Sequence, residues 1–321
     1  MTANQLTIRQ RLFDRRNQDR NGSKVLFVLT LIPIILLVGV SAALVFKTLP
    51  ILREQSLVDL LSGTTWKPLK GLFGYLPFIS STLWVTILAL VLAVPPCILT
   101  AIFLSEYANN ALRSFMRPVL DILAAIPSVI YGVWGMLVIV PWVQNRVIPF
   151  AKSFPNGFPL LVSENPTGYS ILAGAIVLAV MVAPFIIAVT HEVVSTVPAG
   201  IKQASLAVGA TRFQTIYRVI IPATLPGILA SVVLGMSRAL GETMAVMMVV
   251  GNVVQMPGSI LDAAYPLPAL IANNYGEMMS IPMYDSALMG AALILLVMIL
   301  ILNVSSTLVL RKLMGRVRRS W

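Results

Sequence analysis

Charged residues are scarce in this sequence. Asp, Glu, Lys and Arg make up 11% of its 321 residues, whereas a soluble domain usually carries about 25%. Apolar residues reach 58%, and the mean hydropathy is +0.89. This composition excludes an ordinary soluble domain and indicates an integral membrane protein.

Thiol and imidazole groups are almost missing as well. Cys97 is the one cysteine and His191 the one histidine. An internal disulfide is impossible, and we expect no metal site, no cofactor and no convergent catalytic set of an intramembrane enzyme. The pattern Gly-x4-Gly-Lys-Ser/Thr does not occur, so the chain is not expected to hydrolyse ATP itself.

Basic residues nevertheless outnumber acidic ones, 23 to 12, which gives a formal net charge of +11. Such a balance can indicate a nucleic-acid partner, but here the basic residues lie at the ends of apolar segments rather than in one patch. This distribution is typical of membrane topology signals. We therefore expect the chain to lie in a lipid membrane and not to bind nucleic acid.

Six apolar runs are long enough to cross ~30 Å of hydrocarbon as helices. We predict spans at residues 25–46, 79–104, 118–140, 169–190, 225–250 and 287–310. The first span follows a basic leader, 1–24, whose length favours a retained helix over a cleaved signal peptide. The other five form a core at 79–310, and a basic tail covers 311–321.

The basic residues also orient the predicted spans. With the N-terminus inside, most of the 23 basic residues fall on the cytoplasmic side. The tail contributes five of them and no acid: Arg311, Lys312, Arg316, Arg318 and Arg319. The bias predicts a multi-pass protein of the cell (inner) membrane with both termini in the cytoplasm.

Prolines fall inside three of the predicted spans. Pro95 and Pro96 are expected to interrupt the second span, Pro127 the third and Pro184 the fourth. Backbone groups freed by proline cannot face lipid, so these sites should lie against other helices or a water-filled cavity. A simple kink in a packed bundle is the plainer alternative.

A polar segment at 191–222 separates the fourth and fifth spans. Pro198 suits the first position of a helix and Gly209 the residue just past its end, so we predict a short helix at 199–208. Gly209 is expected to adopt a positive φ, which other residues tolerate poorly.

A second short helix is predicted directly after this glycine. Thr211 and Gln214 have the spacing of a capping box, and Pro222 is expected to end the helix. One apolar face is predicted from Phe213, Ile216, Tyr217 and Ile220. Two short helices joined at a glycine favour a docking element, although an ordinary amphipathic loop would show the same pattern.

Two ionisable residues, Arg238 and Glu242, lie in the middle of the predicted fifth span. On insertion scales, a charged side chain at the centre of a span costs roughly 2.5–3.5 kcal/mol. Such residues therefore indicate a structural or functional role. A spacing of four places both side chains on one helix face, close enough to pair. The same face carries Ser231, Gly235 and Ala245, which favours a bundle interior or a pore. A structural pair that locks helices together is the alternative.

The polar segment resembles the EAA loop of ABC importer permeases, the coupling segment that sits in a cleft of the ATP-hydrolysing subunit. The resemblance rests on Gln203, Ala204, Ser205, Leu206, Ala207, Val208, Gly209, Ala210 and Thr211, followed by Ile220, Ile221 and Pro222. Gln203 stands where the family usually has a glutamate. A charge that could pair with the ATPase is therefore missing.

Two further segments resemble phosphate importer permeases. They are AAIPSVIYGVWG at 124–135 and SRALGETMAV at 237–246. Both are more similar to the PstC-type than to the PstA-type subunit, and the resemblance covers about 79–310. It implies an all-α, six-span permease of the type I ABC importer fold, with a cytoplasmic coupling helix.

This resemblance implies the function and the partners. The expected function is translocation of inorganic phosphate, driven by ATP hydrolysed in separate subunits. The expected partners are a second homologous permease, two ATP-binding cassette subunits and an extracytoplasmic phosphate-binding protein. Importers of molybdate or sulfate are the nearest alternative. A stand-alone secondary transporter or channel is another, but it has no use for a coupling loop.

The expected site residues fall into two groups. Arg238, Glu242, Ser237 and Thr243 are assigned to the substrate pathway, because an arginine matches the geometry of phosphate. Glu242 would hold Arg238 when no anion is present and could bind a proton-bearing oxygen of a protonated phosphate. Coupling to the ATPase is assigned to Gln203, Ala204, Ser205, Gly209, Ala210 and Thr211.

Overall fold

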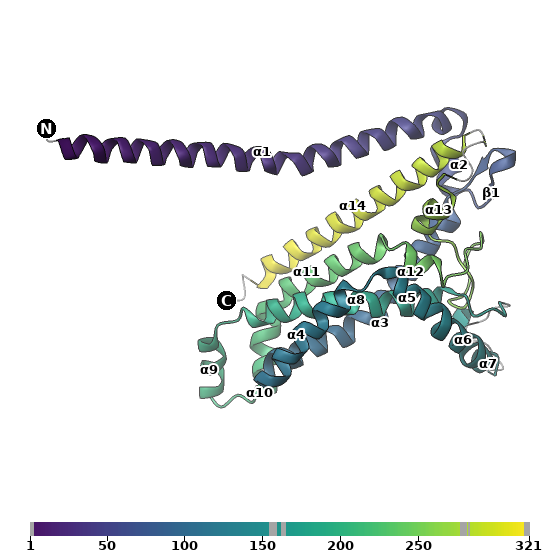
Figure 1. Ribbon diagram of the computed structural model, residues 1–321. Helices are drawn as coiled ribbons and strands as arrows, with labels where there is room; N and C mark the ends of the chain where they lie inside the picture. Colours follow the sequence, from purple (N-terminus) through teal and green to yellow (C-terminus); the bar gives the residue numbers. More distant parts are fainter. Residues whose placement is uncertain (1–2, 154–158, 162–164, 277–280, 282, 318–321) are drawn as a thin grey trace.

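The computed structural model describes residues 3–153, 159–161, 165–276, 281 and 283–317. This part of the chain is mostly helical (Figure 1). Six helical segments are long and apolar enough to cross a membrane: Gly22–Glu54, Leu76–Glu106, Ser128–Lys152, Ile171–Ser195, Arg212–Leu240 and Tyr284–Val309. The predicted all-α fold with six spans is confirmed, although the bounds of several spans differ.

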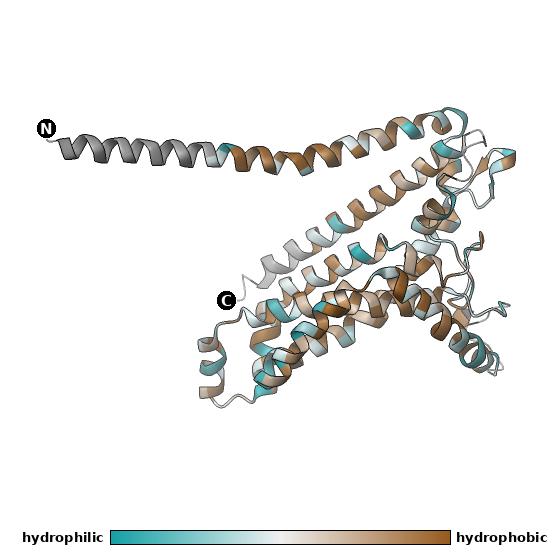
Figure 2. Ribbon diagram, in the orientation of Figure 1, coloured by the Kyte–Doolittle hydropathy of each residue, from teal (hydrophilic) through white to brown (hydrophobic). Residues whose placement is uncertain are grey.

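The first helix, α1 (Ala3–Glu54), stands apart from the others over most of its length (Figure 1). Its apolar stretch is exposed on this chain, and Figure 2 shows it as a hydrophobic band. The C-terminal part of α1 contacts α14 (Tyr284–Val317), where Lys47 pairs with Asp285 at 3.5 Å. One continuous helix thus covers both the predicted leader and the first span.

The centre of the main core is the contact between α3 (Leu76–Glu106) and α8 (Ile171–Ser195). Cys97 is buried in this core. The expected interruptions of these helices are wrong, because both continue through their prolines, Pro95, Pro96 and Pro184. Neighbouring helices and small local adjustments can satisfy the backbone groups that a proline frees. Pro184 is buried in the bundle, whereas Pro95 and Pro96 are exposed on this chain.

The predicted third span, 118–140, is wrong in its bounds because it crosses a break in the backbone. Helix α4 (Asn110–Ala125) begins after Asn109, which caps it, and ends before Ile126. Ile126 has extended backbone angles, as expected for a residue before proline, and Pro127 therefore interrupts the chain as predicted. The helical run that follows consists of α5 (Ser128–Trp134), α6 (Val140–Trp142) and α7 (Ile148–Lys152), joined by π-helical turns at Gly135–Ile139 and Val143–Val147.

The fifth span begins earlier than predicted. Helix α10 (Arg212–Thr215) leads through a π-helical turn, Ile216–Ile220, into α11 (Ile221–Leu240) without a break. Pro222 therefore does not end the second short helix. The wider π-helical turn before Pro222 leaves room for the proline ring and does not depend on the N–H that proline lacks. The helix therefore continues into the bundle.

The two ends of the molecule are built differently. At one end, α9 (Ala199–Ala207) projects from the body, and we call this the α9 end (Figure 1). The opposite end carries α2 (Leu57–Ser62), α13 (Leu267–Asn274) and a hairpin of β1 (Trp66–Lys67) and β2 (Leu72–Phe73), so we call it the hairpin end. Two short 3-10 turns are Pro68–Lys70 and Pro159–Leu161.

An aromatic cluster joins the elements of the hairpin end. The centre of the Trp66 ring lies 5.3 Å from that of Phe73 and 5.1 Å from that of Phe78, at the start of α3. Tyr284 of α14 packs on the same ring at 6.1 Å. Such aromatic pairs add to the free energy of apolar burial, so this end holds α3 and α14 together.

Candidate functional site

Helix α11 ends inside the bundle, just after Arg238. Its last residue is Leu240, Gly241 follows, and a short helix, α12 (Met244–Met247), starts after Thr243. Glu242 therefore lies in the break between the helices, and the predicted common face of Arg238 and Glu242 is wrong. A spacing of four residues brings side chains together only while the helix continues.

Glu242 caps the short helix instead of pairing with Arg238. Its Oε1 accepts a hydrogen bond from the backbone N–H of Ala245 at 3.2 Å. The Thr243 hydroxyl donates to the Gly241 carbonyl at 3.3 Å. A carboxylate at a helix start is stabilised by the free N–H groups there. Glu242 and Thr243 thus hold the backbone of the break in shape.

The Arg238 side chain is exposed on this chain. Its guanidinium carbon lies 5.7 Å from the centre of the Phe185 ring of α8. The ion pairs within the described ranges are Lys47–Asp285 and Lys202–Glu106, so Arg238 has no acidic partner there. An aromatic face stabilises a cation without neutralising it, which leaves this charge available to an anion.

Other residues that were assigned to the pathway or to the face of Arg238 contribute to helix packing. The Ser237 hydroxyl oxygen lies 2.6 Å from Asn303 Oδ1, so it joins α11 to α14. The Ser231 hydroxyl oxygen lies 2.7 Å from that of Thr190 and joins α11 to α8. A Cβ at Gly235 would come within 2.7 Å of an α8 side chain. These contacts orient α11, and Arg238 is the exposed residue among them.

The predicted short helix at 199–208 is confirmed within one residue as α9. Gly209 follows with φ +86°, the left-handed conformation expected of it. Its N–H donates to the Leu206 carbonyl at 3.0 Å, and the N–H of Ala210 donates to the Ser205 carbonyl at 3.3 Å. These bonds satisfy the last carbonyl groups of the helix. No residue of α9 is buried, and Gln203 is exposed.

The capping box is confirmed at the start of α10. The N–H of Gln214 donates to Thr211 Oγ1 at 3.2 Å, and the N–H of Thr211 donates to Gln214 Oε1 at 2.9 Å. The contact fixes the direction in which the chain leaves the Gly209 turn.

The predicted single apolar face after this cap divides into two. Ile216 and Ile220 are buried, whereas Phe213 and Tyr217 are 69% and 65% exposed, with their rings stacked 6.4 Å apart. The π-helical turn changes the angular spacing of the residues, which a regular helix would have kept on one side. We refer to the exposed apolar residues Phe213, Tyr217 and Val208, of which Val208 is 84% exposed, as the apolar end surface.

Sequence reasoning missed two polar groupings near these sites. Glu106 at the end of α3 pairs with Lys202 of α9 at 2.6 Å. Between α4 and α8, a cavity of about 310 Å³ is open to the surface and is lined by Arg117, Leu120, Asp121, Ala188, His191 and Glu192. The partners come from distant parts of the chain, so no local pattern could have indicated either grouping.

Known proteins resemble this chain over most of its length. Residues 97–319 match the family described as binding-protein-dependent transport system inner membrane component. The phosphate transport system permease protein PstC of Mesorhizobium japonicum is 38% identical over 255 residues, which cover 78% of each chain. PstC of Pasteurella multocida is 37% identical over 77% of this chain and 78% of its own. The probable ABC transporter permease protein YqgH of Bacillus subtilis is 35% identical over 89% of this chain and 88% of its own.

Two solved structures share the architecture. An inward-facing structure of the MetNI methionine ABC transporter aligns with a TM-score of 0.52 at 20% identity and covers 75% of this chain and 94% of its own. A bacterial ABC transporter involved in the import of the acidic polysaccharide alginate aligns with a TM-score of 0.56 at 17% identity, over 93% and 99%. At these identities the likeness concerns the fold, which is that of ABC importer permeases.

Proposed function

The chain belongs to the family of binding-protein-dependent transport system inner membrane components, and we propose that it is the permease subunit through which an ATP-driven importer carries inorganic phosphate across the cytoplasmic membrane. The observation that carries the choice of substrate is the Arg238 guanidinium, which lacks an acidic partner within the described residues at the end of α11. The relatives named as phosphate transport permeases support the same choice. An arginine offers phosphate a planar set of donors that matches its oxygens.

We infer that the two ends of the molecule bind different partners. The exposed α9 and the apolar end surface support docking of an ATP-hydrolysing subunit at the α9 end. Two such subunits, a second homologous permease and an extracytoplasmic phosphate-binding protein at the hairpin end complete the proposed importer. Because Gln203 is uncharged, docking here relies more on apolar contact than on an ion pair at that position.

For this importer we expect the α9 end and both termini to lie in the cytoplasm; part of the basic tail lies outside the described residues. Single cysteines in a Cys97→Ser background test the orientation. Ser62→Cys at the hairpin end should react with an impermeant reagent from outside, and Gln203→Cys should react only after permeabilisation. Reaction of Gln203→Cys in intact cells would contradict the proposed orientation.

Uptake of labelled phosphate by the reconstituted complex tests the function. We expect uptake of phosphate into the liposomes to require ATP and to persist when molybdate or sulfate is present in excess. Strong competition by either oxyanion would assign the importer to that substrate instead. Uptake without ATP would indicate a secondary transporter.

A further inference from the structure

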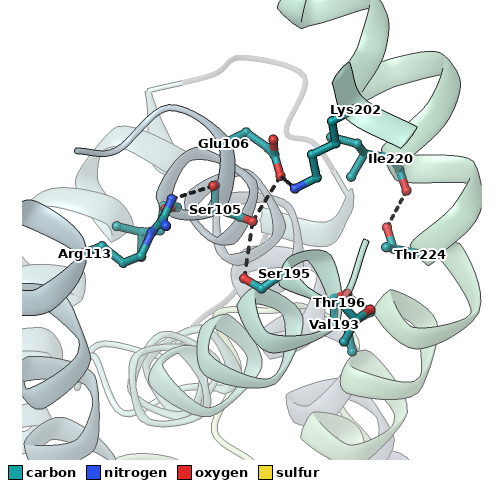
Figure 3. Close-up of polar contacts among 10 residues, drawn as sticks. Ser105, Glu106, Arg113, Val193, Ser195, Thr196, Lys202, Ile220 and Thr224 are labelled. Carbon is teal, nitrogen blue, oxygen red and sulfur yellow. Dashed lines mark hydrogen bonds and ion pairs between the residues drawn. The ribbon is translucent and has the colours of Figure 1, made fainter. Parts of the chain in front are cut away.

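The C-terminal end of α3 is a meeting point of helices at the α9 end (Figure 3). Lys202 Nζ of α9 lies 2.6 Å from Oε1 of Glu106, the last residue of α3. The two side chains are only 23% and 13% exposed. Water competes little for charges that are shielded in this way, so this ion pair is held more firmly than one on an open surface.

Ser105 and Arg113 extend this contact to two further helices (Figure 3). The Ser105 hydroxyl oxygen lies 3.2 Å from Glu106 Oε1 and 3.4 Å from the hydroxyl oxygen of Ser195, at the end of α8. Arg113 of α4 donates from Nε to the Leu104 carbonyl at 3.1 Å and from Nη2 to the Ser105 carbonyl at 2.7 Å. The start of α4 is therefore tied to the end of α3.

The far end of α4 is tied to the region of the candidate pathway. The Tyr131 hydroxyl of α5 donates to the Leu123 carbonyl of α4 at 2.8 Å, across the break at Pro127. Helix α5 packs closely on α12, because a Cβ at Gly132 would come within 3.2 Å of the Ala245 Cα. A continuous series of contacts thus leads from α9 through α3, α4 and α5 to the helix that Glu242 caps.

Helix α9 has few other attachments. Among the residues with described side chains, its side-chain hydrogen bonds to other helices are Lys202 to Glu106 and Ser205 Oγ to Thr215 Oγ1, the latter at 3.0 Å. The second contact leads to α10, which follows α9 directly in the chain. The pair of Lys202 and Glu106 is therefore the polar contact that connects α9 to a different part of the bundle.

Building on the proposed function, we propose that Glu106 and Lys202 are positioning residues that transmit movement of a docked α9 to α3 and α4. Through this ion pair, ATP hydrolysis in a partner subunit would be coupled to rearrangement at the break between α11 and α12. Without the pair, a partner bound to α9 can move this helix while α3 stays in place.

The test measures bound ATPase, ATP hydrolysis and phosphate uptake on the same reconstituted complex. Glu106→Gln and Lys202→Met each remove one charge. We expect both variants to bind the ATPase and hydrolyse ATP, while phosphate taken up per ATP falls roughly tenfold, within the usual range of coupling between sites. Lys202→Arg keeps the charge and should keep this ratio. The exchanged pair, Glu106→Lys with Lys202→Glu, should recover it.

A matched control removes the other ion pair of the described chain. Asp285→Asn separates Lys47 from Asp285, whose side chains are 57% and 43% exposed, and uptake per ATP should not change. A normal ratio in Glu106→Gln would overturn the proposal. An equal loss of bound ATPase and of uptake would also overturn it, because the pair would then only support docking. No uptake by the unaltered complex would contradict the proposed function itself.

Discussion

The helix that runs from α10 into α11 exposes different chemical groups at its start and at its end. At its start, Phe213 and Tyr217 present apolar rings to the surroundings. At its end, Arg238 presents a positive charge with no acidic partner among the described residues. Burial against another protein stabilises an exposed apolar surface, whereas a counter-ion stabilises a charge that lies among apolar helices. The proposed function therefore assigns a partner protein to one end of this helix and an anion to the other.

The two regions also differ in how they are held. The start depends on contacts between near neighbours in the chain, such as Thr211 with Gln214. The end depends on other helices, through the contacts of Ser231 with Thr190 and of Ser237 with Asn303. Mutations at the start should therefore act on assembly with a partner, and mutations at the end on passage of the substrate.

The largest effect is expected at the exposed charge. Arg238→Gln should leave assembly and ATP hydrolysis intact but lower phosphate uptake at least about tenfold, because a charge pair at 4 Å is worth ~4 kcal/mol near a protein surface. Arg238→Lys keeps the charge without the planar fork and should retain part of the uptake. The measurement is ATP-driven uptake normalised to assembled complex. Full uptake by Arg238→Gln would reject the pathway role.

A smaller loss is expected at the turn that presents α9. Gly209 has φ +86°, and nothing lies within 4 Å of an added Cβ, so a substitution acts through backbone strain alone. The left-handed conformation costs other residues roughly 1–2 kcal/mol, and β-branched ones tolerate it worst. Gly209→Val should reduce co-purification of the ATPase more than Gly209→Asn does. Equal retention by both variants would show that the turn is not needed for docking.

The apolar end surface allows a direct comparison of exposed and buried neighbours. Phe213→Ala should weaken co-purification of the ATPase several-fold while the melting temperature of the isolated permease stays the same. Ile216→Ala should instead lower that temperature, since removing a buried isoleucine side chain costs about 2–5 kcal/mol. If Phe213→Ala destabilises the permease as much as Ile216→Ala, the exposed rings serve folding rather than docking.

The smallest effect is expected at the cap of α12. Glu242→Gln retains an oxygen that can accept from the Ala245 N–H, so uptake should remain near normal. Glu242→Ala removes the acceptor and should destabilise the break by about 0.5–2 kcal/mol, the usual cost of losing a helix cap. Thermal unfolding and uptake of both variants check this. A severe loss in Glu242→Gln would show that the charge itself is required, as an ion pair or a substrate contact would demand.

Features that depend on neighbours in the chain could be predicted from the sequence. Six apolar runs gave six helical segments because a bilayer requires each spanning helix to be long and apolar. The short helix before Gly209, its positive φ and the capping box of Thr211 and Gln214 involve residues only a few positions apart. Their hydrogen bonds form in the same way whatever the rest of the bundle does.

Features that depend on distant residues were decided by the tertiary structure. The helix continues through Pro222 and stops after Leu240, and its end separates Arg238 from Glu242. The pairing of Glu106 with Lys202 joins residues that are far apart in the chain. A sequence pattern records which groups are available, but the approach of helices determines which groups meet, because a charge pairs with whatever packing brings within a few ångströms of it.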